Sequence, residues 1–99
     1  MNAIDLARSA SSDSSPPLGL STIGMILWFA KAGRWDEAHD RCQEAEGPAG
    51  FWLHAYLHRE EGDLANAAYW YSQARKPMPP ADVSLADEWR EITTSLLSS

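Results

Sequence analysis

The chain has one cysteine, no cluster of basic residues and no apolar run long enough to span a membrane. Cys42 is the single cysteine among 99 residues, so an internal disulfide is excluded, as is typical of a reducing cytoplasm. The net charge is −6 and the basic residues are scattered, which argues against nucleic-acid and anionic-membrane partners. The longest uncharged apolar run spans residues 18–30, shorter than the roughly twenty residues of a transmembrane helix. We therefore expect a soluble, cytoplasmic protein.

Motifs that would identify an enzyme are also missing from the sequence. It contains no G-x-S-x-G turn, no phosphate-binding loop and no paired-cysteine metal motif. The first residues do not combine a charged stretch with an apolar one, so we expect no signal peptide. We assign no catalytic residue and no cofactor, and an enzyme of a kind without a known motif stays only as a third hypothesis.

The composition divides the chain into two parts. Residues 9–17 are rich in serine and end in Pro16-Pro17, which is typical of a linker. We therefore expect residues 1–19 to be a flexible N-terminal segment and residues 20–97 to form a single helical-repeat domain.

Apolar residues in that domain recur at helical spacing, and no alternating run indicates a strand. Gly33 and Gly62 are typical helix ends, Asp63 is suited to begin a helix, and Ser84 with Asp87 resembles a capping box. The spacing and these signals together predict five helices, over about 20–32, 34–46, 49–61, from 63 past 74, and 83–97.

A pattern repeats with a period of twenty-nine residues, because residues 33–38 (GRWDEA) match residues 62–67 (GDLANA). Cys42 and Tyr71 continue the same register. A helix–turn–helix unit cannot bury its apolar face alone, so such units stack. We expect an all-α fold of two stacked antiparallel helical hairpins with a C-terminal capping helix.

These residues resemble a known family, the tetratricopeptide repeat, over about residues 22–79. The matching positions are Gly62-Asp63, Ala67, Tyr71, Ala74 and Pro79. The chain departs from the family in having about two units, Cys42 in place of an aromatic residue and His58 in place of a tyrosine. The run over residues 52–74 also resembles a group of small bacterial proteins of unknown function. The tetratricopeptide resemblance implies a module that binds a protein or peptide partner.

In such stacks the first helix of each pair lines a concave groove. By the resemblance, Trp52, Tyr56 and Arg59 would face that groove and are the candidate partner-binding residues, since aromatic and arginine side chains are typical interface anchors. The alternative is that Trp52 packs beneath the last helix and that Arg59 pairs with Asp63.

Self-association into a homodimer is a further expectation, because two repeats leave an open end. Leu20, Ile23 and Leu27 are the candidate residues for that face.

The second functional hypothesis is a metal or small-ligand site. His54 and His58 are four residues apart and Glu61 follows on the same helical face, which is a ligand spacing. A third strong ligand is not evident, and His39 would have to come from another helix. The alternative is that His58 is a buried polar residue that hydrogen-bonds to Asp63 or Asn66. We therefore assign no metal from the sequence.

Overall fold

The expected all-α class is confirmed by the computed structural model, which describes residues 2–45 and 47–97. No strand occurs in that part of the chain, and no helix in it is both long and apolar enough to cross a membrane. The helices are α1 (Ala3–Ser12), α2 (Thr22–Lys31), α3 (Trp35–Cys42), α4 (Pro48–Glu60), α5 (Leu64–Ala74) and α6 (Leu85–Leu97).

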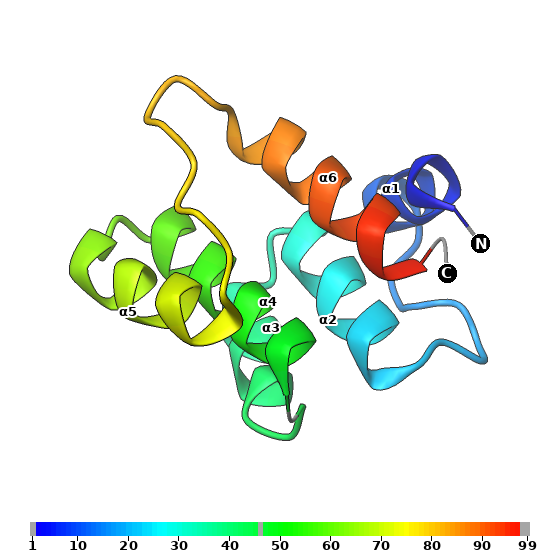
Figure 1. Ribbon diagram of the computed structural model, residues 1–99. Helices are drawn as coiled ribbons and strands as arrows, with labels where there is room; N and C mark the ends of the chain where they lie inside the picture. The colour runs from blue at the N-terminus through cyan, green and yellow to red at the C-terminus, as the bar shows by residue number, and fades with distance from the viewer. Residues whose placement is uncertain (1, 46, 98–99) are drawn as a thin grey trace.

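Two antiparallel hairpins, α2 with α3 and α4 with α5, lie side by side, with α5 at one end of the molecule (Figure 1). Both hairpins turn in the same way. The amide of Arg34 donates to the carbonyl of Phe29 at 2.9 Å, and the amide of Asp63 donates to the carbonyl of His58 at 2.9 Å. The intervening glycines, Gly33 and Gly62, have φ of 79° and 86°. Residues with a Cβ atom rarely adopt such positive φ values, whereas glycine does so readily. The twenty-nine-residue repeat therefore extends to the backbone of the turn.

Small residues allow the paired helices to approach closely. Ala38 and Ala67, equivalent in the repeat, are both fully buried. Cys42 and Tyr71 follow them one turn later and are also buried. At this equivalent buried position, the first hairpin has the smaller Cys42 and the second has the bulkier Tyr71.

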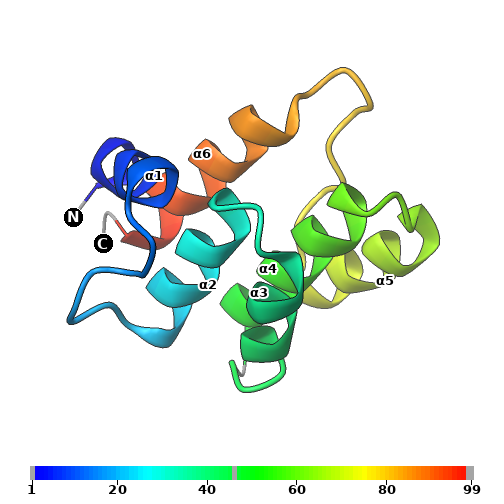
Figure 2. The ribbon, with the colours of Figure 1, turned by 180° about the vertical axis from the view of Figure 1, so that it is seen from behind.

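Helix α6 lies across α2 and α4 rather than continuing the row of hairpins (Figures 1 and 2). Trp89 and Ile92 are its anchors, at 2% and 0% exposure. The indole Nε1 of Trp89 donates to the carbonyl of Leu27 at 3.0 Å, which fixes α6 on α2. The last helix therefore covers the first helices of both hairpins.

We had expected residues 1–19 to be a flexible segment outside the domain, but residues 3–12 form helix α1, which is part of the folded unit. Helix α1 packs on α2 and α6, and Leu6 is fully buried in the core. Ser9 accepts a hydrogen bond of 3.0 Å from the indole Nε1 of Trp28, which ties α1 to α2. Leu6 is the one large buried side chain of this short helix, because Ile4 is exposed, so its stability depends on the neighbouring helices.

Helix α3 is shorter than predicted and ends at Cys42, and Glu46 lies outside the described residues. The chain must reverse direction between the end of α3 at Cys42 and the start of α4 at Pro48. A Cβ atom at Gly50 would lie 2.4 Å from the carbonyl oxygen of Ala45, so only glycine permits this approach. The other helices agree with the predicted ranges within about two residues. The predicted cap of α5 is confirmed, since Asp63 accepts from the backbone amide of Asn66 at 3.3 Å. Ser84 accepts from the backbone amide of Asp87 at 3.0 Å, which is one of the two bonds of the predicted capping box.

Candidate metal centre

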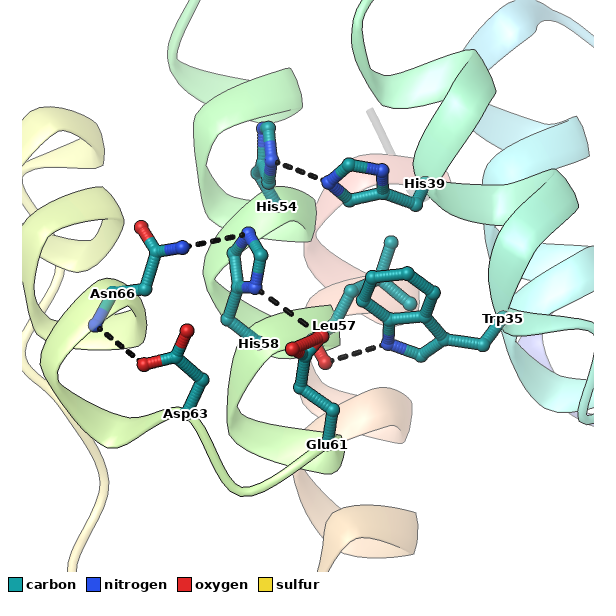
Figure 3. Close-up of polar contacts among 8 residues, drawn as sticks. All are labelled: Trp35, His39, His54, Leu57, His58, Glu61, Asp63 and Asn66. Atoms are coloured by element: carbon teal, nitrogen blue, oxygen red, sulfur yellow. Dashed lines mark hydrogen bonds and ion pairs between the residues drawn. The ribbon is translucent and has the colours of Figure 1, made fainter.

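The three histidines of the chain lie together between α3 and α4, although they are distant in sequence (Figure 3). His54 and His58 are one turn apart on the same face of α4. His39 comes from α3, which is fixed on α4 by Trp35, whose indole Nε1 donates to the carbonyl of Leu57 at 2.7 Å. One ligand nitrogen from each ring lies within 4.8 Å of the other two.

Aromatic stacking holds two of the rings in place. Trp35 stacks on His39 with centroids 4.7 Å apart, and Trp70 of α5 stacks on His54 with centroids 4.1 Å apart. Both pairs are nearly parallel, at 9° and 8°. Helices α3 and α5 thus each supply a tryptophan that restricts the site.

His39 and His54 are the closest pair, with their Nε2 atoms 3.0 Å apart. At this distance one ring donates its N–H and the other accepts with its lone pair. A zinc ion with Zn–N bonds of about 2.0–2.1 Å in tetrahedral geometry places two ligand nitrogens about 3.3–3.4 Å apart. If the Nε2 atoms of His39 and His54 moved apart by a few tenths of an ångström, a metal could therefore replace the proton that they share.

The electrostatics of the cluster favour uncharged imidazoles. Burial, followed by the positive charges that His39 and His58 would carry, lowers the pKa of His54 from 6.5 to about 4. His54 is therefore neutral at pH 7, and its lone pair is available without the loss of a proton. Neutral imidazole is the form in which histidine binds a metal.

His58 is the most buried of the three, at 6% exposure. Its Nε2 lies 3.4 Å from the side-chain nitrogen Nδ2 of Asn66, which confirms the predicted contact between this imidazole and the following helix. Its Nδ1 lies 3.5 Å from a carboxylate oxygen of Glu61 and has no hydrogen-bond partner. A carboxylate at the second nitrogen is the usual arrangement that orients a metal-binding histidine.

Of the predicted ligand residues, the structure therefore brings His54 and His58 together and adds His39. Glu61 contacts His58 from the side of Nδ1 and belongs to a separate group of possible ligands, with His58 and Asp63. The sequence signal for His39 is the i, i+4 spacing from Trp35, which puts both side chains on the face of α3 that packs on α4.

The predicted partner-binding residues lie elsewhere, beneath α6. Trp52 and Tyr56 are 7% and 4% exposed, so the alternative that Trp52 packs under the last helix is confirmed. The predicted pair of Arg59 with Asp63 is wrong, because Arg59 instead forms an ion pair of 2.8 Å with Glu88 of α6 and donates to the carbonyl of Val83. Trp52 and Tyr56 are therefore buried, and Arg59 is engaged by α6.

Glu88 is the centre of a buried polar network that the sequence analysis missed. It is 3% exposed and accepts hydrogen bonds from both Arg59 and the hydroxyl of Tyr71. Burial, and then this hydrogen bond, raises the pKa of Tyr71, so the hydroxyl stays a donor. The network connects α4, α5 and α6.

Cys42 is a packing residue, as predicted. Burial raises the pKa of its thiol to about 12, so the reactive thiolate is not formed near neutral pH. The face predicted for self-association is also in use within the chain, since Leu27 is fully buried and Leu20 and Ile23 pack partly buried against the core.

Comparison of the chain with protein-family models, with curated proteins and with solved structures finds no match.

Proposed function

We propose that this protein binds a divalent transition-metal ion through His39, His54 and His58. The observation that carries the proposal is the convergence of three imidazoles from two helices, each with a nitrogen within 4.8 Å of the others. Imidazole ligands suit zinc, copper, nickel and iron. We take zinc as the first ion to test because it accepts three histidines in tetrahedral geometry and adds no redox chemistry.

The surroundings of the rings support this assignment. The stacked Trp35 and Trp70 restrict His39 and His54, so little side-chain freedom is lost when a metal binds. The carboxylate of Glu61 lies beside Nδ1 of His58 and would orient that ring to bind through Nε2.

Isothermal titration calorimetry of the metal-free protein with zinc tests the proposal. We expect one zinc ion per chain and a loss of binding in His39→Gln, a partly exposed position where glutamine keeps hydrogen-bonding capacity. At a free zinc concentration of about 100 times Kd, stability should rise by about 2.7 kcal/mol. That corresponds to a Tm increase of about 10–20 °C for a domain of this size.

Asp63→Asn provides the matched control. It removes the carboxylate of the second group, His58 with Glu61 and Asp63, while asparagine still caps α5. Zinc affinity should not change in this variant. The proposal fails if zinc does not bind, or if binding persists in His39→Gln but is lost in Asp63→Asn.

Protein or peptide recognition is the second candidate function, based on the tetratricopeptide resemblance. What supports it is that α6, an amphipathic helix, already lies across α2 and α4, so a partner helix with similar anchors would fit the same surface by displacing it. A labelled peptide of residues 83–97 should bind the Trp89→Ala variant, in which α6 is loosened, more tightly than the unmodified chain. Equal or undetectable binding to both would contradict this candidate.

A further inference from the structure

One side of helix α5 is exposed along its whole length. Among the residues that the structure describes, α5 packs on α4 and on no other helix, and it lies at one end of the molecule (Figure 1). Leu64 and Tyr69 on this side are each 55% exposed. We define the α5 face as the exposed residues that share this side at helical spacing, which are Leu64, Ala65, Ala68, Tyr69, Ser72 and Gln73.

The repeat indicates that this face is suited to pack on another helix. Leu64 and Ala68 are equivalent, at the period of twenty-nine residues, to Trp35 and His39 of α3. In the first hairpin this side of the helix is covered, because Trp35 donates to the carbonyl of Leu57 and α3 packs on α4. The helix that follows the second hairpin, α6, lies across α2 and α4 instead. The equivalent side of α5 is therefore a packing face that α6 leaves uncovered.

The α5 face is also free of charge, although the chain carries a net charge of −6. None of the eleven residues of α5 is acidic or basic. Acidic chains repel one another when their charged surfaces approach. A contact through α5 avoids that repulsion, so a second copy of this chain can approach along this helix.

The charges that flank α5 are opposite in sign at its two ends. Glu61 and Asp63 precede the helix and Arg75 follows it, and all three are exposed. If two copies of the helix lie antiparallel, the basic end of each meets the acidic end of the other. A two-fold axis near Tyr69, midway between Asp63 and Arg75, satisfies both ends at once, whereas a parallel pair would bring like charges together.

Arg75 occupies a backbone position at which glycine is the usual residue. It ends α5 with φ of 59° and ψ of 41°, and it is the one residue other than glycine with positive φ in the described chain. Its side chain forms no ion pair within residues 2–45 and 47–97. The guanidinium is therefore available to a carboxylate of a second molecule.

We propose that the chain forms a homodimer about a two-fold axis, through antiparallel contact of two α5 faces. Arg75 of each copy pairs with Asp63 of the other, and Tyr69 of each copy lies over Ala65 and Ala68 of the other. One helix against its copy buries less than the roughly 1,200 Å² of a stable interface, so we expect a dissociation constant on the order of 1–100 μM. The dimer does not depend on the histidine site.

Sedimentation velocity of the full chain, from about 5 to 500 μM in the presence of a chelator, measures the dimer without a contribution from metal. We expect the average mass to rise from that of a monomer to that of a dimer. Ala68→Glu places a carboxylate from each copy near the axis and should raise Kd at least roughly tenfold. The matched control is Ala86→Glu, the same change at an exposed alanine of α6, which should leave Kd unchanged.

Arg75→Gly tests the ion pairs without weakening the fold. Glycine suits the positive φ at this position, so the Tm should not fall. At low salt Kd should nevertheless rise at least roughly threefold, and Asp63→Asn, which still caps α5, should have a similar effect. Added salt should weaken the dimer of the unmodified chain more than that of Arg75→Gly.

The results decide both the surface and the arrangement. A monomer throughout the concentration range would overturn the proposal, as would a Kd that Ala68→Glu leaves unchanged or that Ala86→Glu raises equally. A Kd that does not change in Arg75→Gly would overturn the antiparallel arrangement. Thermal unfolding of each variant verifies that it is folded, so that a loss of dimer is a loss of the contact.

Discussion

Acid should destabilise this protein through His54, and the size of the effect follows from its surroundings. The pKa of His54 is about 4 in the folded chain against 6.5 for a free imidazole. Between these values the unfolded chain binds a proton at this residue that the folded chain does not, so stability falls as the pH decreases from 6.5 to 4. Above pH 6.5 both states are neutral at His54 and the contribution is constant.

The magnitude can be worked out from that difference. About 2.5 pKa units at about 1.36 kcal/mol each gives roughly 3 kcal/mol. His54 is partly exposed, so solvent screening reduces the figure to about 2 kcal/mol. Since a domain has only about 5–15 kcal/mol of stability, this is a measurable part of the total.

Urea unfolding of the metal-free protein at pH 7.5 and pH 4.5 measures the effect. Carboxylates also titrate in this range, so the comparison is with His54→Gln, which keeps a hydrogen-bonding partner for His39 but does not titrate. The unmodified chain should lose about 2 kcal/mol more than the variant between the two pH values. Parallel losses in both proteins would refute the reasoning that His54 is held neutral by burial beside His39 and His58.

Three substitutions test the packing that positions the site. Glu88→Ala leaves the charge of Arg59 and the hydroxyl of Tyr71 buried without this partner, so urea unfolding should show a loss of about 3 kcal/mol; a loss below about 1 kcal/mol would mean that the network is dispensable. Ala67→Leu should overpack the fully buried contact in the second hairpin and cost about 1–3 kcal/mol, and an unchanged Tm would contradict the helix pairing. Leu6→Ala should lower the free energy of unfolding, measured by calorimetry, by about 2–5 kcal/mol because Leu6 is fully buried. An unchanged stability would mean that α1 is not part of the core.

The helices were predictable because their signals are local. Gly33 and Gly62 supply the positive φ at which two helices end, and Asp63 and Ser84 supply the oxygens that begin two others. Helix α1 was not expected in the core because Leu6 is its one large buried apolar side chain and a serine-rich stretch follows it.

The site depends on which helices pack against one another, and local sequence patterns do not specify this. The spacing of His54 and His58 placed them on one face of α4, but the sequence does not say that the same face meets His39 of α3. That contact exists because the turn before α3 directs Trp35 and His39 together onto α4.

The sequence by itself thus determined an all-α chain with two related hairpins, because helix periodicity and helix ends depend on neighbouring residues. Only the tertiary structure decided which faces are covered. Trp52 and Tyr56 are buried and Arg59 pairs with Glu88 of α6, so the side chains expected to face a partner are engaged within the chain. The three imidazoles come together for the same physical reason. One face of a helix could pack against several different neighbours, and the packing of the six helices together selects one of these arrangements.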